Sequence, residues 1–175
     1  MNKNLNPLII ILLLVEFKMI PKEFFVTCGK AVSKVSPLNA FDLALVKAGI
    51  AQCNLVNVSS ILPPGCKEIK RRKIPVGSIT HAVLARMDGN EGETIGAGVA
   101  WAWKKDGEYG LVAEAHGYMD RKALLEILDW KINEMAQNRG IELTKIKHKI
   151  DVLWIPMDHY GSVISALVYI PTQKE

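Results

Sequence analysis

A pair of serines stands between an apolar run and a double proline, and this stretch constrains the backbone more than any other part of the chain. Val56 and Val58 are β-branched and favour an extended backbone, while Pro63 and Pro64 fix their own φ angles. A residue that precedes a proline is also pushed away from helical geometry. We therefore expect the Ser59–Ser60 peptide to be held extended from both sides.

From these residues alone, Ser59–Ser60 has two interpretations. The ordinary one is a turn in which a serine hydroxyl caps the next segment, and dipeptide statistics favour it. The other is a backbone rearrangement in which Oγ of Ser60 attacks the carbonyl carbon of Ser59, helped by strain and by an oxyanion donor. The surrounding sequence decides between them.

Several short motifs follow one another in a specific order. They are Pro37-Leu38-Asn39-Ala40-Phe41-Asp42, Ala48-Gly49-Ile50, Asn54-Leu55, Val58-Ser59-Ser60-Ile61-Leu62-Pro63-Pro64, Gly92-Glu93-Thr94-Ile95 and Gly110-Leu111-Val112-Ala113-Glu114. Together they resemble the pyruvoyl-dependent arginine decarboxylases, over most of the chain from about Phe24 onward. No single motif would be specific, but the combination favours the rearrangement.

The resemblance implies self-cleavage into a β chain that ends at Ser59 and an α chain that begins at Ser60. The cofactor would be a covalent pyruvoyl group derived from Ser60, with no pyridoxal phosphate. Its ketone would form a Schiff base with L-arginine, and agmatine and carbon dioxide would leave. Two alternatives stay open: decarboxylation of another amino acid, such as histidine, and an unprocessed, non-catalytic subunit of the same fold.

Glu114 is flanked by Ala113 and Ala115 in an apolar strand, where alternation places it on the same face as Val112. A carboxylate there either points to solvent or is buried with a raised pKa. The resemblance implies that Glu114 is the catalytic acid that reprotonates the substrate carbon. A raised pKa suits a proton donor that works near neutral pH.

Asp42 and Asn54 also have an ordinary and a functional interpretation. An acid near a helix start commonly stabilises the helix dipole, and an asparagine commonly begins a strand after a turn. The resemblance implies instead that Asp42 binds the guanidinium of arginine through paired hydrogen bonds. It implies that Asn54 assists cleavage by donating to the oxyanion at Ser59, and that Ser59 also contacts the substrate.

The pattern of elements favours the α+β class, since strands dominate and two helices could each cover a sheet. We expect strands at 24–28, 79–87, 93–103, 110–117, 145–155 and 162–170, a loop at 29–35, a turn at Asp88-Gly89, and helices over 38–48 and from Asp120 to Gly140. Phe41, Leu45 and Ala48 should form the buried stripe of the first helix. The resemblance sharpens the fold to a four-layer αββα sandwich. It also implies a homo-oligomer, a trimer or a dimer of trimers of αβ units, with active sites between subunits.

The chain has 175 residues, of which 49% are apolar, and this suits a single domain. Its net charge of +4 comes from a mixed surface, and we interpret the basic residues between Lys67 and Lys73 as a solvated loop rather than a nucleic-acid site. The three cysteines show no CxxC pair, which indicates reduced thiols in a cytoplasm. The four histidines are scattered, and we expect no metal.

The apolar run from Leu8 to Val15 is too short to cross a bilayer, which needs about 20 residues. No small-residue cleavage site follows it, so we do not expect export or a membrane partner. Met19 lies just before the part of the chain that resembles the family. We interpret residues 1–18 as a non-core N-terminal extension, such as one arising from an unused upstream start, and residues 19–175 as the decarboxylase domain.

Overall fold

The structure is a computed structural model that describes residues 20–171, so the expected N-terminal extension lies outside the described residues. The elements in chain order are β1 (Glu23–Ser33), α2 (Pro37–Ala48), β2 (Asn54–Asn57), β3 (Ile61–Leu62), β4 (Lys67–Glu68), β5 (Ile79–Gly89), β6 (Thr94–Trp103), β7 (Gly110–Gly117), α3 (Arg121–Gln137), β8 (Lys147–Trp154) and β9 (Tyr160–Tyr169).

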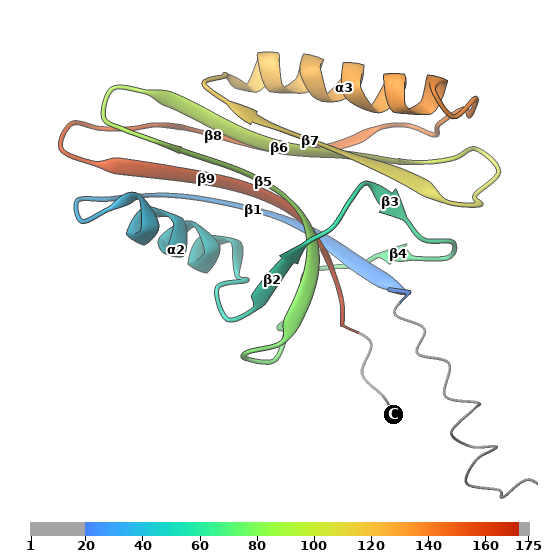
Figure 1. The fold of residues 1–175 in the computed structure, drawn as a ribbon, viewed down its shortest axis with the longest axis horizontal. Coiled ribbons are helices and arrows are strands. Elements are labelled where there is room, and N and C mark those ends of the chain that lie inside the picture. The colour runs from blue at the N-terminus through green and yellow to red at the C-terminus, as the bar shows by residue number, and fades with distance from the viewer. Residues whose placement is uncertain (1–19, 172–175) are drawn as a thin grey trace, which may run out of the picture.

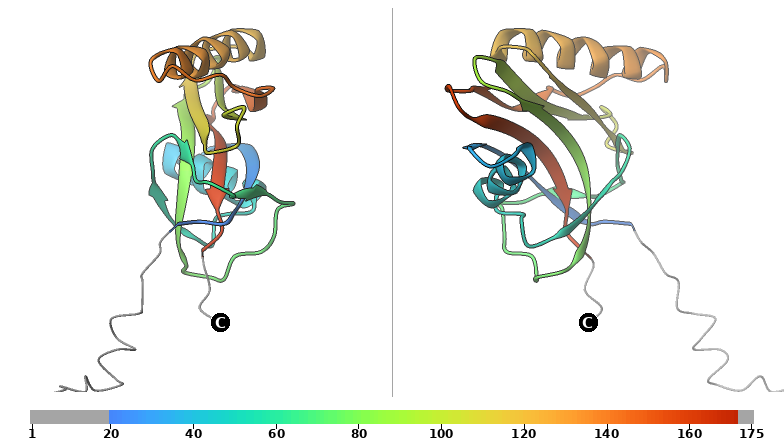
Figure 2. Two further views of the ribbon diagram at one scale, coloured as in Figure 1. Left: turned by 90° about the vertical axis from the view of Figure 1, so that its right-hand side faces the viewer. Right: turned by 60° about the vertical axis from the view of Figure 1, so that its left-hand side comes forward.

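The strands form two sheets that face each other. The first sheet has the order β2-β5-β9-β1-β4 and the second has the order β3-β7-β6-β8. Helix α2 covers the outer face of the first sheet, and α3 covers the outer face of the second (Figure 1), an arrangement that the right-hand view of Figure 2 also shows. The expected α+β fold, a four-layer αββα sandwich, is confirmed.

Apolar side chains fill all three spaces between the four layers. Phe24, Val99, Val112 and Leu167 belong to the core between the sheets. The core beneath α2 includes Phe25, Ala44 and Ile164, and the core beneath α3 includes Leu111, Leu124 and Leu128. Each sheet is therefore buried on both faces over much of its area, which explains why β6 and β9 are almost continuously apolar.

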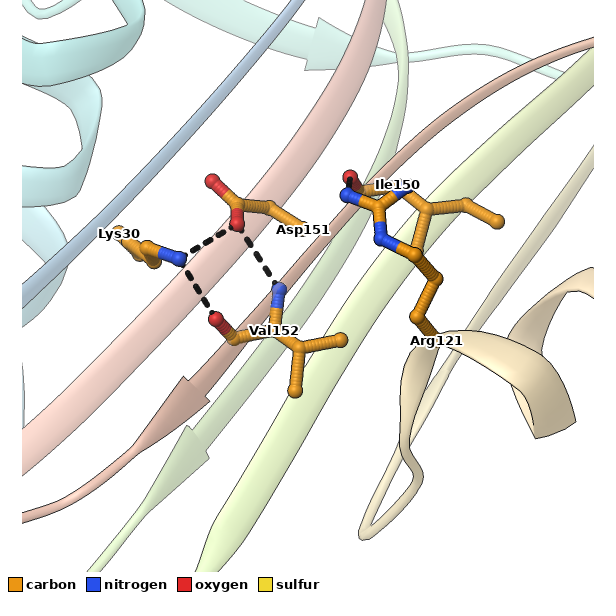
Figure 3. Close-up of polar contacts among 5 residues, drawn as sticks. All are labelled: Lys30, Arg121, Ile150, Asp151 and Val152. Carbon is orange, nitrogen blue, oxygen red and sulfur yellow. Dashed lines mark hydrogen bonds and ion pairs between the residues drawn. The ribbon is translucent and has the colours of Figure 1, made fainter.

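Polar contacts hold β8, an edge strand of the second sheet, to neighbouring layers (Figure 3). Nζ of Lys30, on β1, donates to Oδ1 of Asp151 and to the carbonyl of Val152, both at 2.8 Å. Nη2 of Arg121, at the start of α3, donates to the carbonyl of Ile150 at 2.6 Å. The first sheet and α3 are thereby both joined to the same strand of the second sheet.

Helix α2 begins and ends where its capping residues predict. Oγ of Ser36 accepts a hydrogen bond from the amide of Asn39, and Gly49 adopts the left-handed conformation with φ of 73°. The expected buried stripe is only partly right. Ala40, Ala44 and Ala48 are fully buried, whereas the larger Phe41 and Leu45 pack at the margin, because small side chains allow α2 to lie close to the sheet.

The expected loop at 29–35 is wrong, because β1 continues to Ser33. The strand pairs with β9 along its whole length, from Phe24 opposite Tyr169 to Ser33 opposite Tyr160. Gly29 interrupts the apolar pattern because α2 crosses there, and a Cβ on Gly29 would lie 2.1 Å from the carbonyl oxygen of Ala44. The glycine thus marks a helix contact rather than the end of a strand.

The turn expected at Asp88-Gly89 is wrong, because the chain turns further along. Both residues belong to β5, where Gly89 pairs with Gly161. The chain turns at Glu91-Gly92, and Gly92 has φ of 78°. The strands expected over 93–103, 110–117, 145–155 and 162–170 are all present, and so is the helix capped by Asp120, which ends at Gln137, before Gly140.

Candidate active site

The Ser59–Ser60 peptide lies where the chain passes from one sheet to the other. β2 belongs to the first sheet and β3 to the second (Figure 1). On the upstream side, the amide of Val58 donates to the carbonyl of Ala82 at 3.0 Å. On the downstream side, the carbonyl of Ser60 accepts from the amide of Val112 at 2.8 Å. The peptide is therefore spanned between two anchored points, one on each sheet.

Ser60 and Glu114 lie together at a cavity of about 260 Å³ between the edge of β7 and α3. Ser60 is partly buried, whereas Ser59 is exposed. β3 pairs with β7 only at Gly110 and Leu111. No other strand among the described residues covers the rest of that edge of β7, and this leaves room for a small molecule beside Ser60.

Burial raises the pKa of the Glu114 carboxyl. The charges of His116 and Lys131 act in the opposite direction, and loss of water is the larger effect. The Glu114 side chain is exposed in the isolated chain, so the raised pKa comes from the part of the carboxyl that faces protein. A carboxyl in this position retains its proton to higher pH than an ordinary glutamate.

The structure does not bring Asn54 to the cavity beside Ser60. Its Nδ2 donates to the carbonyl of Gly77 at 2.9 Å, and its backbone amide donates to the carbonyl of Ser78 at 2.9 Å. Asp42 is exposed on α2, in the outer layer opposite α3 (Figure 1). Within one chain, Asp42 therefore lies on the other side of the sandwich from Glu114.

Helix α3 contributes side chains that the sequence interpretation did not single out. Lys131, Glu134, Met135 and Asn138 line the cavity with Ser60. Nζ of Lys131 donates to the carbonyl of Glu114 at 2.9 Å. Their helical spacing, i, i+3, i+4 and i+7, predicts a shared face, but only the packing of α3 on β7 reveals what that face meets.

The remaining histidines and cysteines form no evident second site in the part of the chain that is described. His148 pairs with Asp129 at 2.7 Å between β8 and α3, and His159 contacts the carbonyl of Met157 at 2.7 Å. Cys28, Cys53 and Cys66 are free thiols. Within residues 20–171, no group of three or more histidine, cysteine or acidic residues is arranged to hold a metal, and no helix is long and apolar enough to span a membrane.

An αββα sandwich with a Ser-Ser peptide spanned between its sheets, beside a carboxyl of raised pKa, has the features of a pyruvoyl-dependent decarboxylase. The family model of pyruvoyl-dependent arginine decarboxylase matches residues 23–174. The chain belongs to this family, and the resemblance drawn from its motifs is confirmed.

Curated relatives agree with this assignment. A pyruvoyl-dependent arginine decarboxylase of Methanococcoides burtonii is 39% identical over 132 residues, covering 71% of this chain and 73% of the relative. The Thermococcus kodakarensis protein of the same name is 33% identical over 73% of this chain and 82% of its own length. The Methanopyrus kandleri one is 32% identical over 86% of this chain and 97% of its own length.

Among solved structures, a pyruvoyl-dependent histidine decarboxylase at pH 8 matches with a TM-score of 0.48 and 14% identity, over 59% of this chain and 56% of that one. A likeness this slight supports no conclusion about the site.

Proposed function

We propose that this chain is a self-processing decarboxylase that converts L-arginine to agmatine and carbon dioxide. The single observation that carries the proposal is the Ser59–Ser60 peptide spanned between the two sheets, in a chain that belongs to the arginine decarboxylase family. Each end that cleavage would create is already anchored, one through Val58 to the first sheet and the other through Ser60 to the second. The fold can therefore survive the cut.

The cleavage uses atoms of the chain alone until its last step. Oγ of Ser60 attacks the carbonyl carbon of Ser59, the C–N bond breaks, and the hydroxyl proton passes to the nitrogen of Ser60. Loss of the Ser60 α-proton then breaks the Cβ–Oγ bond, so Oγ leaves as part of the Ser59 carboxylate. The resulting enamine at residue 60 takes up water and releases ammonia, which leaves a pyruvoyl group.

The surroundings of Ser60 suit such a group. The carbonyl of Ser60 is held by Val112, and Ser60 lines a cavity large enough for a small ligand. Once formed, the ketone supplies an electron sink for the bond that loses carbon dioxide. We assign no role to pyridoxal phosphate or to a metal.

Glu114 is the proposed proton donor to the substrate carbon. It lines the same cavity as Ser60, and burial raises its pKa, so a protonated carboxyl is available nearer to neutral pH. We further propose that Asn54 assists cleavage and that Ser59 contacts the substrate. Because the Asn54 amide is bonded to Gly77 in the uncleaved chain, its part would require the amide to exchange that partner.

We propose that Asp42 binds the substrate guanidinium in a neighbouring copy of the chain. It is exposed on the outer layer opposite α3, so it cannot serve the cavity of its own chain. A trimer or a dimer of trimers, with sites between subunits, would bring α2 of one copy to Ser60 of the next. Residues 19–175 would form the cleaved domain, and free thiols are consistent with a cytoplasmic location.

Denaturing mass spectrometry of the purified protein, with and without borohydride in the presence of arginine, tests chain cleavage and formation of the ketone together. We expect two fragments that meet at Ser59 and Ser60, with the larger one blocked at its N-terminus and gaining the mass of agmatine on reduction. Ser60→Ala should remain a single chain, and a cleaved Ser60→Ala protein would refute the proposal. Reduction products carrying another amine, or an intact unmodified chain, would also contradict it.

A further inference from the structure

The chain downstream of Ser59–Ser60 is held by hydrogen bonds from both sheets. The amide of Val112, on β7, donates to the carbonyl of Ser60 at 2.8 Å. The hydroxyl of Tyr169, on β9, donates to the carbonyl of Ile61 at 2.7 Å. Two consecutive carbonyls beside the cleavage point are therefore held from opposite layers of the sandwich.

Tyr169 is well placed to act as a fixed donor. It is 4% exposed, and burial, with a smaller contribution from Cys66, raises the pKa of its hydroxyl, so the proton stays on the oxygen. β9 pairs with β1 on one side and with β5 on the other. The Tyr169 hydroxyl therefore lies on β9, a strand that is fixed by pairing on both sides.

The strand that carries the new chain end is, by contrast, very short. β3 consists of Ile61 and Leu62 alone, and Pro63 follows. After cleavage, residue 60 becomes a chain terminus, and termini fray unless they are tied down. If β3 were held only by its pairing with β7, residue 60 would directly precede a strand of only two residues.

We propose that Tyr169 is a positioning residue for the reaction assigned above: its bond to Ile61, together with the Val112 bond to Ser60, holds residue 60 in place for cleavage and orients the ketone afterwards. This inference rests on the proposed function. The carbonyls of Ser60 and Ile61 belong to the first two peptide bonds of the α chain, and both accept a hydrogen bond. Holding both restricts rotation of the ketone relative to Glu114.

Tyr169→Phe removes only the hydroxyl, and Ser165→Ala provides a matched control. Ser165 lies four residues earlier on the same strand, is 0% exposed, and its Oγ donates to the carbonyl of Lys149 at 2.8 Å. Each variant loses one bond between the sheets, but only Tyr169→Phe loses the one next to residue 60. The measurements are the rate at which freshly made precursor is cleaved, and kcat and KM for arginine.

We expect Tyr169→Phe to slow cleavage and to lower kcat by roughly tenfold while leaving KM nearly unchanged, because misplacing a reacting group costs rate rather than binding. Ser165→Ala should lower the unfolding temperature to a similar extent but keep both rates. Equal losses of activity in the two variants, or unchanged rates in Tyr169→Phe, would overturn the inference. An unmodified protein that is never cleaved would overturn the proposed function itself.

Hydrogen exchange in the unmodified protein tests the same arrangement without a substitution. Since the amide of Val112 donates to the carbonyl of Ser60, its protection reports whether residue 60 stays in place. We expect this amide to be equally protected in the uncleaved Ser60→Ala chain and in the cleaved protein. Loss of protection on cleavage would show that the new terminus frays, against the inference.

Discussion

Glu114 illustrates how the neighbours of a residue set its environment. Its strand alternates between two buried environments: Val112 contributes to the core between the sheets, while Ala113 and Ala115 pack beneath α3. Glu114 falls on the Val112 face but beyond the reach of β3. The carboxyl is therefore partly desolvated and still open to a substrate, which is the environment that a proton donor requires.

The raised pKa of Glu114 predicts a pH dependence of turnover. We expect kcat to fall as the pH rises through that pKa, because the carboxyl loses the proton that it donates. Glu114→Gln should still be cleaved at Ser59–Ser60 but should turn over arginine about 10²- to 10⁴-fold more slowly, with no such pH limb. Steady-state kinetics over a pH series, with cleavage followed on a denaturing gel, makes the comparison. A Glu114→Gln enzyme with the unmodified pH profile would contradict the assignment.

The same shift predicts a pH dependence of stability. When the pKa of a carboxyl is raised by folding, the folded state holds the proton more tightly, so its stability declines as the pH rises from the unfolded value of 4.5. Glu114→Gln removes this decline. We expect the unfolding temperature of the variant, relative to the unmodified chain, to be higher at pH 7 than at pH 4, as measured with both proteins in Ser60→Ala form. No change in the difference would speak against desolvation of Glu114.

At the scale of elements, two helices lie on two sheets, and each contact depends on glycines in the strands below. A Cβ on Gly29 of β1 would meet the backbone of α2, at 2.1 Å from the carbonyl oxygen of Ala44. A Cβ on Gly98 of β6 would meet the ends of the Leu128 and Ile150 side chains, at 2.9 and 2.8 Å. Side chains can move aside, whereas a helix backbone moves only with the whole helix.

This difference predicts the relative cost of two alanine substitutions. We expect Gly29→Ala to lower the free energy of unfolding by at least about 3 kcal/mol, since α2 must be displaced, and Gly98→Ala by about 1–2 kcal/mol. Denaturant unfolding of both variants in the uncleaved Ser60→Ala background measures the two costs. Equal costs would mean that α2 adjusts more freely than its backbone contact with β1 implies.

At the scale of the whole molecule, the proposed site divides between the two outer layers. Ser60 and Glu114 lie on the side of α3, while Asp42 lies on α2. The buried surface of α2 consists of small alanines, and Leu38, Leu43 and Val46 are left exposed on its outer side. An apolar outer surface beside Asp42 is consistent with a subunit contact there.

Subunit mixing tests whether Asp42 serves a neighbouring copy. Asp42→Ala and Glu114→Gln chains should each be nearly inactive on arginine. When they are produced together in equal amounts, about a quarter of the sites should combine an intact Asp42 from one copy with an intact Glu114 from the next. Recovery of activity near that fraction is the expected result. If both residues belonged to one chain's site, every mixed site would carry a defect and no activity would return.

Much of this molecule was predictable from local sequence. Helix ends follow from Ser36, Gly49 and Asp120, because capping depends only on residues within one turn. The strands β6 and β7 likewise follow from pattern. The expected end of β1 at Cys28 was wrong because Gly29 signals a contact with α2, which no short stretch of sequence reveals.

The candidate site was predictable in part. The Ser59–Ser60 pair and Glu114 carry their chemistry in their identities and immediate neighbours, so the sequence by itself determined which residues to consider and to which family they belong. Only the tertiary structure decided that Ser60 lines one cavity with Glu114 and α3, that Asp42 lies on the opposite layer, and that Tyr169 holds Ile61 from 108 residues away. The reason is physical: caps and strand preferences act within a few residues, whereas these contacts arise from the pairing and stacking of sheets whose strands are distant in the chain.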